Sequence, residues 1–322
     1  MKDFTGKIAV ITGGGTGMGR ELARQLAAEG CSVAMCDVSA SNMAATKALC
    51  EADAPQGVRV TSHVADVSDP AQVRRFADEA AAAQGADHIH LLFNNAGIGG
   101  GGSFVAGDVE NWEKTFNVCW GGVYHCTRAF LPLLKAAREG HIINTSSVNG
   151  FWASIGPGIP HTAYAAAKFA VKGFTEALIT DLAVNAPHIH CSVVMPGHIG
   201  TDIITNSRKI LSGDHSDEIT PAAIAAARGR MSALGLDGQS ASDDDVAAFL
   251  NRQARAFHDN APMTAAEAAR VILDGVRNDA WRILVGADAH VIDRRVRADP
   301  EHAYDRDFFQ EYAREVGWNL GV

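Results

Sequence analysis

The sequence predicts an α/β fold in which a doubly wound sheet of seven parallel strands lies between two layers of helices. Three observations carry this prediction. Short apolar runs alternate with helix-length segments, a glycine-rich loop joins the first run to the first helix, and 322 residues suffice to bury a sheet on both faces. Strands that alternate with helices in this way pair in parallel through right-handed crossovers.

The strands are read from β-branched and aliphatic runs that end at glycine or polar residues. In chain order they are KIAVIT (7–12), SVAMCD (32–37), GVRVTSHV (57–64), HIHLLFN (88–94), HIINTS (141–146), HIHCSVVM (188–195) and WRILVG (281–286). Helices are expected between them, at 17–29, up to 52, from Pro70, and at 111–137, 162–185 and 264–277. Pro70 follows Asp69 at a first helical position, and Thr264 forms a capping box with Glu267.

Residues 202–262 depart from this alternation because they hold no strong strand. Their amphipathic pattern predicts a helical substrate lid, with one helix from Thr220-Pro221 and another after an acidic cluster. The acidic residues of the lid are expected on its solvated face: Asp214, Asp217, Glu218 and Asp243–Asp245. The tail at 288–322 is charged and then aromatic, up to Trp318, and we expect it to pack as a terminal segment.

Composition and charge exclude several classes of function. The formal charge is -9 and the pI is about 5.8, so no nucleic-acid partner is expected, because binding through phosphates needs a basic surface. No apolar run reaches the roughly 18–20 residues that cross a bilayer. The start MKDFTGKIAV lacks the apolar core of a signal peptide. We therefore expect no membrane partner and a cytoplasmic location.

No metal site is expected either. The six cysteines are scattered without paired spacing, which is typical of small buried residues in a reducing compartment. Four histidines form two alternating pairs, but these lie at the starts of separate strands, away from the sheet edge where ligands bind: His88, His90, His188 and His190.

The glycine-rich loop predicts a dinucleotide site. Thr12-Gly13-Gly14-Gly15-Thr16-Gly17-Met18-Gly19 stands between the first strand and the first helix, where glycines allow a tight turn and a close approach to a pyrophosphate. The helix offers free N–H groups and its positive dipole end to the phosphates. A purely structural turn is the alternative. We therefore expect a Rossmann-type fold and one dinucleotide-binding catalytic domain over 1–322, with a lid insertion at 202–262 and a C-terminal extension at 288–322.

Asp37 ends the second strand and predicts NAD rather than NADP. A carboxylate at this position accepts hydrogen bonds from the adenosine ribose hydroxyls and repels a 2′-phosphate. The next residues, Val38-Ser39-Ala40, supply no arginine to bind such a phosphate. The alternative is that Asp37 only caps the following helix.

Tyr164 and Lys168 form the sharpest chemical signal. Residues i and i+4 share a helix face, so the ammonium is expected beside the phenol. Ser146 and Ser147 follow the fifth strand at the carboxyl edge of the sheet. Lys168 and an oxidised nicotinamide both favour the phenolate, and lowering the tyrosine pKa from about 10 to near 7 requires about 4 kcal/mol. Tyr164 then exchanges a proton with an alcohol oxygen that a serine stabilises.

Together these motifs resemble those of the short-chain dehydrogenases/reductases. The shared set is Thr12-Gly13…Gly17-x-Gly19, Asn94-Asn95-Ala96-Gly97, Asn117, Ser147, Tyr164-x-x-x-Lys168 and Pro196-Gly197, over about 7–201 and again over 264–286. The resemblance implies a catalytic set of Asn117, Ser147, Tyr164 and Lys168. In that set Asn117 holds a water on a proton relay to Lys168, and Ser146 is the fallback for Ser147.

The resemblance also implies which residues hold the cofactor. Asp66 and Val67 match the pair that contacts the adenine, Asn94 to Gly97 stabilise the sheet and flank the cofactor, and Pro196 to Thr201 lie along the nicotinamide. The expected cofactor-binding residues are Gly13, Gly17, Met18, Gly19, Asp37, Asp66, Val67, Asn94, Ala96, Gly97, Tyr164, Lys168, Pro196, Gly197, Ile199 and Thr201.

One spacing departs from the family pattern. Ser147 and Tyr164 are 17 residues apart, and the extra length at 151–161 is expected to bulge over the substrate. With the lid, several apolar side chains suggest a fairly apolar substrate: Phe151, Trp152, Ile155 and Ile199. His161 and His198 adjoin the motifs, and each is open to two readings, contact with a ligand or a structural role.

The sequence therefore predicts an NAD(H)-dependent oxidoreductase that interconverts a secondary alcohol and a ketone, with a tyrosine as general acid and base. The alternatives are an NADPH-dependent ketoreductase of the 3-oxoacyl type and a non-catalytic, cofactor-binding regulator. The resemblance also implies a homodimer or homotetramer, paired through the helices at 111–137 and 162–185.

Overall fold

The computed structural model describes residues 1–213, 219–233 and 237–317, and in this part of the chain seven parallel strands form the predicted sheet. Their order is β3-β2-β1-β4-β5-β6-β9. The strands are β1 Ile8–Thr12, β2 Ser32–Asp37, β3 Val60–Val64, β4 Leu91–Asn94, β5 Gly140–Thr145, β6 Ile189–Pro196 and β9 Arg282–Val285. Because the strand order reverses between β1 and β4, the loops after these strands diverge and leave room for a ligand.

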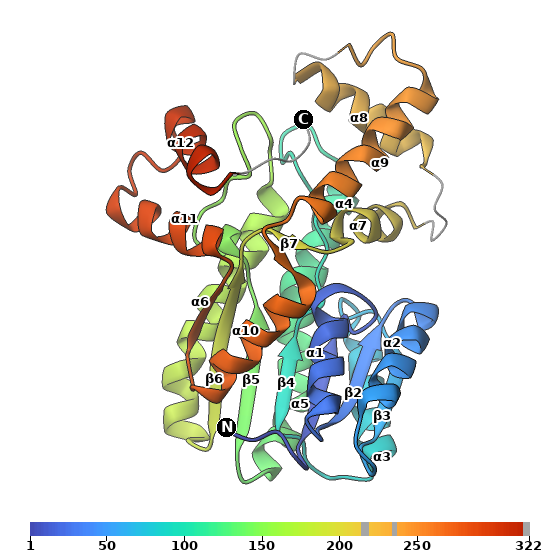
Figure 1. The fold of residues 1–322 in the computed structure, drawn as a ribbon, viewed down its shortest axis with the longest axis vertical. Helices are drawn as coiled ribbons and strands as arrows, with labels where there is room; N and C mark the ends of the chain where they lie inside the picture. The colour runs from blue at the N-terminus through green and yellow to red at the C-terminus, as the bar shows by residue number, and fades with distance from the viewer. Residues whose placement is uncertain (214–218, 234–236, 318–322) are drawn as a thin grey trace.

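Helices cover both faces of the sheet, as predicted (Figure 1). One layer consists of α1 Gly17–Ala28, α2 Ala40–Asp53 and α10 Ala265–Arg277. The other consists of α3 Pro70–Gln84, α4 Val109–Phe116, α5 Gly122–Ala136 and α6 Thr162–Asn185. Alternate residues of a strand pack against opposite helix layers. Ala9 and Ile11 of β1 lie in one core and Val10 lies in the other, and all three are fully buried.

Local signals set the helix ends where the sequence placed them. The Asp69 carboxylate accepts hydrogen bonds from the N–H groups of Ala71 and Gln72 and caps α3, and Thr264 with Glu267 forms the capping box of α10. The helix expected at 111–137 is instead interrupted. A π-helical turn at Asn117–Gly121 separates α4 from α5, and its extra residue rotates the side chains that follow.

The lid contains three helices among the described residues, where the sequence indicated two. They are α7 Ile203–Ser212, α8 Pro221–Ala233 and α9 Asp243–Asp259, and short strands β7 Ile199–Gly200 and β8 Met263–Thr264 pair at their base. Helices α8 and α9 share a small apolar core of Ala227, Met231, Val246 and Leu250. The residues Asp243–Asp245 begin α9 on its exposed side, as expected. The other three acidic residues, Asp214, Asp217 and Glu218, lie outside the described residues.

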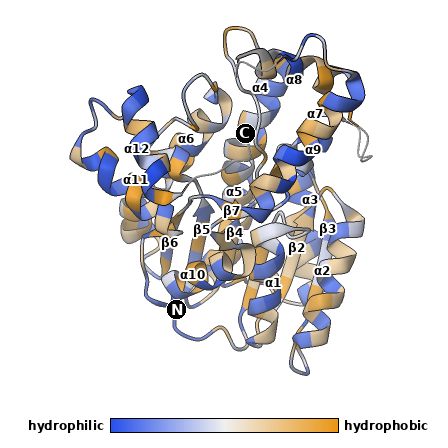
Figure 2. Cartoon of the chain, turned by 45° about the horizontal axis from the view of Figure 1, so that its top comes forward, coloured by the Kyte–Doolittle hydropathy of each residue, from blue (hydrophilic) through white to orange (hydrophobic). Residues whose placement is uncertain are grey.

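The C-terminal extension packs, as predicted, and it forms α11 Ala287–Ala298 and α12 Arg306–Val316 on the opposite side of the sheet edge from the lid (Figure 1). Its aromatic residues cover Trp152, which is 2% exposed, with ring centres 6.1 Å away for Phe309 and 5.5 Å for Tyr312. Both hydrophilic and hydrophobic residues appear on α9, α11 and α12 in Figure 2. Trp318 lies outside the described residues.

This packing corrects one expectation about the segment 151–161. Trp152 and Phe151 belong to the core beneath the extension, so they do not form an apolar wall for a substrate. The extra length contacts the extension at Gly156, where a Cβ would lie 3.1 Å from the ring of Phe309. Trp152 and the Ala303 carbonyl that its indole N–H contacts are 151 residues apart in the chain, and no local pattern predicts such a contact.

All six cysteines are buried and unpaired, as predicted from their scattered spacing. Within the described ranges, no helix combines the length and the apolar character needed to cross a bilayer.

His141 on β5 couples the stability of the sheet to pH. Its side chain is 1% exposed, and Nε2 lies 2.7 Å from the Ser192 hydroxyl, which itself donates to the Ala280 carbonyl. Nε2 is therefore the donor to Ser192. Burial lowers the pKa of His141 to about 3, so the folded protein excludes a proton that the unfolded chain binds below its ordinary pKa of about 6.5.

We expect this group to lower the free energy of unfolding by about 2 kcal/mol between about pH 7.5 and about pH 5. His141→Gln keeps a donor near the Nε2 position and should reduce that loss, as measured by urea unfolding at both pH values. The exposed His290→Gln is the control and should retain the pH dependence of the unchanged protein. An identical pH dependence in His141→Gln would contradict the assignment.

Candidate active site

The glycine loop after β1 packs against the turn after β4. Gly13 has φ +67°, and a Cβ there would lie 2.8 Å from Cα of Ala96, while a Cβ on Gly19 would overlap the Gly13 carbonyl oxygen. Two backbones can approach this closely only without side chains between them. The loop therefore presents its own N–H groups, followed by the start of α1, to whatever lies in front of it.

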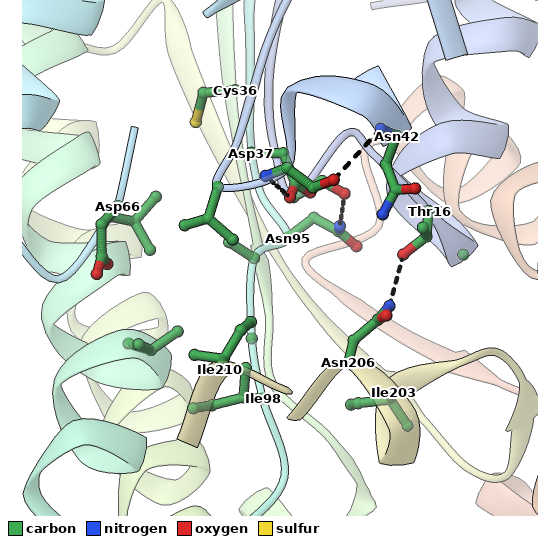
Figure 3. Close-up of a pocket in the computed structure, with 18 of the residues that line it drawn as sticks. Thr16, Cys36, Asp37, Asn42, Asp66, Asn95, Ile98, Ile203, Asn206 and Ile210 are labelled. Atoms are coloured by element: carbon green, nitrogen blue, oxygen red, sulfur yellow. Dashed lines mark hydrogen bonds between the residues drawn. The ribbon is translucent and has the colours of Figure 1, made fainter. Parts of the chain in front are cut away.

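A cavity of about 430 Å³ opens at this loop, where the strand order reverses. Figure 3 shows Asp37 and Asp66 on its upper side and Ile203, Asn206 and Ile210 of α7 opposite. The predicted cofactor-binding residues that line it are Gly13, Gly17, Met18, Asp37, Asp66, Val67, Ala96, Gly97 and Thr201. Glycine-rich backbone, a helix N-terminus and an acidic residue at the end of β2 are the features that a dinucleotide requires.

The Asp37 carboxylate points into this cavity and is held from two sides. Oδ2 accepts a hydrogen bond from the Gly15 N–H and Oδ1 accepts one from the Ser39 N–H, both at 3.0 Å. The cap of α2 is Ser39, whose hydroxyl accepts from the Asn42 N–H. The alternative reading of Asp37 as a helix cap is therefore wrong.

Asn94 is placed in the sheet rather than at the cavity. It is 2% exposed, and its amide nitrogen donates to the hydroxyl of Thr127 and to the side-chain oxygen of Asn144. Of the two roles that the resemblance implied for the segment from Asn94 to Gly97, Asn94 has the structural one. Asn95, which belongs to the segment expected to flank the cofactor, lines the cavity.

Helix α7 lines part of this cavity, which the sequence patterns did not predict. Asn206 donates a hydrogen bond to the hydroxyl of Thr16 at 3.0 Å and so ties the lid to the glycine loop. The spacing of Ile203, Ser207 and Ile210 is helical and was the available signal.

A second cavity of about 110 Å³ shares Met18, Gly97 and Thr201 with the first. It brings together the predicted residues Ser147, Tyr164 and Lys168 with Pro196, Gly197 and Ile199, and it adds Phe257 from the end of α9. Lys168 is 2% exposed, and its Nζ donates to the Thr145 carbonyl at 2.8 Å and lies 5.4 Å from the centre of the Tyr164 ring. The i, i+4 spacing thus places ammonium and phenol side by side.

The two serines after β5 have different roles. The Ser146 hydroxyl donates to the backbone carbonyl of Lys168 at 2.7 Å and fastens α6 to the sheet. Ser147 lies close enough to the Tyr164 phenol to lower its pKa, and the Ser147 hydroxyl oxygen accepts a hydrogen bond from the Asn149 N–H at 3.1 Å. Ser147 therefore faces the phenol, which favours it over Ser146 as the residue that contacts a substrate oxygen.

Burial governs the ionisation of the pair. It raises the pKa of the Tyr164 phenol, against a smaller lowering effect of the nearby Ser147 side chain, and it lowers the pKa of the Lys168 ammonium. In the chain alone the phenol is thus protonated at neutral pH. The pKa near 7 predicted for Tyr164 refers instead to the site with an oxidised nicotinamide present.

The structure does not bring Asn117 to the site. Its side chain is exposed at the start of the π-helical turn, and neither cavity has it among the described residues that line it. Cys119, two residues further on, is fully buried, donates to the Ile98 carbonyl at 3.2 Å and faces the Lys168 ammonium. The π-helical turn decides which residue of this helix points inward.

Two histidines that were open to alternative readings are now placed. The His161 ring lies 4.7 Å from the Tyr164 ring at the entry to α6, and burial lowers the pKa of His161 to about 4. His198 is 4% exposed, so it is not solvated. Over the described ranges, no group of three or more potential ligands is arranged to hold a metal.

A nucleotide-binding crevice at the reversal of a parallel sheet, joined to a cavity lined by a tyrosine, a lysine and a serine, defines an α/β oxidoreductase. The sequence model of the short chain dehydrogenase family matches residues 7–211, and this chain belongs to that family. Among the solved structures similar to the chain, one is in complex with NAD and another with NADP.

The relatives include proteins that match most of the chain. SadH of Mycobacterium tuberculosis is 34% identical over 293 residues, which are 91% of each protein. Levodione reductase of Leifsonia aquatica is 35% identical over 216 residues, 66% of this chain and 76% of its own. A short-chain dehydrogenase/reductase of Burkholderia phymatum, solved with NAD, has a TM-score of 0.74 at 29% identity and covers 94% of this chain and 96% of its own.

The close packing of the glycine loop can be tested by substitution at Gly19. Gly19→Ala places a methyl group against the Gly13 carbonyl, so we expect a lower melting temperature and weaker NADH binding by fluorescence titration. Gly173→Ala is the matched control, because it lies inside α6 with open space around it and should gain about 0.5–1 kcal/mol in stability. Equal stability and binding in both variants would contradict the role assigned to Gly19.

Proposed function

We propose that the chain is an NAD(H)-dependent oxidoreductase that interconverts a secondary alcohol and a ketone on a fairly apolar substrate. One observation carries the proposal. Tyr164, Ser147 and Lys168 line one cavity, which shares Met18, Gly97 and Thr201 with the dinucleotide crevice. Sheet, lid and C-terminal extension are proposed to act as one catalytic unit over 1–322.

The residues of the chain supply proton transfer and orientation, and the bound dinucleotide supplies or accepts the hydride. A ketone oxygen between Tyr164 and Ser147 receives two hydrogen bonds, which stabilise the negative charge that develops on it. Because burial raises the pKa of Tyr164, the phenol is protonated at neutral pH and is ready to donate its proton to that oxygen. In the oxidation direction Tyr164 must first lose this proton.

Lys168 favours the loss of the phenol proton of Tyr164. Its ammonium lies 5.4 Å from the phenol ring and is held by the Thr145 carbonyl, so its charge favours the phenolate. Burial lowers the pKa of Lys168, and the fixed carbonyl partner offsets part of the cost of keeping the charge in place.

The walls of the smaller cavity favour an apolar substrate. Around Tyr164 the lining includes Met18, Ile199, Ile203 and Phe257, and these side chains offer no hydrogen bonds to hydroxyl groups of a sugar or polyol. A relative whose name records reduction of a dione supports a ketone as the substrate class.

Tyr164→Phe tests the chemistry. We expect turnover of a ketone panel with NADH to fall by about 10²–10⁴-fold, because the proton donor is lost, while the NADH dissociation constant stays within about twofold. The panel comprises acetone, cyclohexanone, acetophenone and a 3-oxoacyl thioester, followed by NADH absorbance.

Tyr124→Phe is the matched control, since Tyr124 is exposed on α5 outside both cavities, and it should retain full activity. Retained activity in Tyr164→Phe would contradict the catalytic assignment. An unchanged protein that binds NADH but reduces no member of the panel would favour the non-catalytic regulator.

Asp37 supports NAD over NADP, whereas one residue favours the alternative of an NADPH-dependent ketoreductase. Among the described residues that line the larger cavity, Lys209 of α7 is the one with a positive charge. We propose that Asp37 dominates, because it closes the end of β2 where the adenosine ribose is expected and is held there by two N–H groups.

Asp37→Ser should lower the preference for NADH over NADPH, measured as the ratio of kcat/KM values, by at least about tenfold. A charged hydrogen bond contributes about 1.5–3 kcal/mol, and 1.4 kcal/mol is about tenfold. Lys209→Met should leave the ratio unchanged. A loss of NADPH activity in Lys209→Met, together with higher activity of the unchanged protein with NADPH, would favour the alternative.

We also propose a homodimer or homotetramer and a cytoplasmic location. Helix α6 exposes apolar side chains at Phe169, Ile179 and Val184, the last of them 73% exposed, which suits pairing with a second copy. Light scattering of the purified chain measures the assembly directly.

A further inference from the structure

The segment after β6 is held from two sides. The Gly197 N–H donates to the Val285 carbonyl at 2.9 Å, and the His198 N–H donates to Oδ2 of Asp288 at 2.6 Å, so both partners come from β9 and the start of the C-terminal extension. On the other side, the His198 ring reaches the last turn of the lid helix α9. His198 thus lies between the extension and the lid.

Asp288 fits this segment closely. It is 3% exposed, and a Cβ on either Gly197 or Gly286 would overlap one of its carboxylate oxygens. The carboxylate stands in the first turn of α11, where the helix dipole favours a negative charge. Asp288 therefore fixes the backbone from which the His198 ring projects.

The His198 ring binds the end of α9 in two ways. Nε2 lies 2.6 Å from the Phe257 carbonyl oxygen, and because a carbonyl only accepts, Nε2 carries the proton. The last carbonyls of a helix lack partners within it, so this donor satisfies one of them. The ring also packs on the Phe257 ring, with centres 4.3 Å apart.

Phe257 is in turn a wall of the smaller cavity, with Ser147, Tyr164 and Ile199. The end of α9 is close to the same segment at a second point, since a Cβ on Gly200 would lie 2.8 Å from the His258 carbonyl oxygen. The position of the Phe257 ring relative to Tyr164 therefore depends on the contact with His198.

We propose that His198, fixed by Asp288, is a positioning residue that holds Phe257 against the substrate space and so determines the preference for ketones with a bulky apolar group. The inference rests on the proposed function for its substrate class. In this proposal the lid provides a fixed apolar wall of the substrate space, and the His198 imidazole connects the lid to the extension.

The experiment compares His198→Leu, His198→Gln and Phe257→Ala with the unchanged protein. Leucine fills the space but donates no hydrogen bond, whereas glutamine places an amide N–H near the Nε2 position. His258→Gln is the control, an exposed histidine at the same end of α9. The measurements are kcat and KM for cyclohexanone and for acetone, the NADH dissociation constant, and amide hydrogen exchange of residues 250–259.

We expect His198→Leu and Phe257→Ala to raise the KM for cyclohexanone by about tenfold with kcat within about twofold, which is the pattern of lost uniform binding. The KM for acetone and the NADH dissociation constant should change by less than about twofold. Amide hydrogen exchange at 250–259 should be faster in His198→Leu than in the unchanged protein. The variants His198→Gln and His258→Gln should both behave like the unchanged protein.

Two results would overturn the inference. One is unchanged exchange and an unchanged cyclohexanone KM in His198→Leu. The other is a parallel loss of kcat, NADH binding and melting temperature in both His198 variants, which would mark a general structural role. If the unchanged protein reduces neither ketone, the proposed function fails separately, and the exchange comparison alone decides whether His198 positions α9.

Discussion

Hydrogen bonds between the end of β1 and the turn after β4 hold together the two loops on which the whole site depends. The Thr12 hydroxyl oxygen accepts from the N–H groups of Asn95 and Ala96, each at 3.0 Å, and the Asn95 amide donates to the Thr12 carbonyl at 3.1 Å. Because the chain leaves β1 and β4 toward opposite layers of helices, these bonds fix how close the diverging loops lie. Gly13 is required at this point, since the backbone of Ala96 occupies the place of a side chain.

The chemistry of the site depends on the side chains that are brought together and buried beside this junction. The carboxyl ends of β5 and β6 carry Ser147 and Pro196 to the same edge of the sheet, and α6 lays Tyr164 and Lys168 across it. Ser146 donates a hydrogen bond to the Lys168 carbonyl and so attaches α6 to the sheet. Ser146 therefore positions the helix that carries Tyr164. Lys168 is buried and Tyr164 is partly buried, which makes the protonation of the pair sensitive to any charge brought into the crevice.

The sequence predicted most of the fold because strand runs and helix caps are local signals. The pattern of KIAVIT, the Asp69-Pro70 pair and the capping box of Thr264 each specify structure within a few residues, and each is found as expected. The inward-facing residue of the helix after β4 could not be predicted in the same way. A single π-helical turn shifts the register, so that Cys119 rather than Asn117 faces Lys168.

The sequence by itself determined the parallel sheet, the glycine loop, the acidic end of β2 and the spacing of Tyr164 and Lys168, because these follow from periodicity and from backbone conformations that few residues can adopt. Only the tertiary structure decided which serine faces the phenol, that Trp152 belongs beneath the C-terminal extension, and that His198 joins the extension to the lid. Each of these contacts joins segments far apart in the chain or depends on the direction of one side chain, and such contacts are set by how the layers pack.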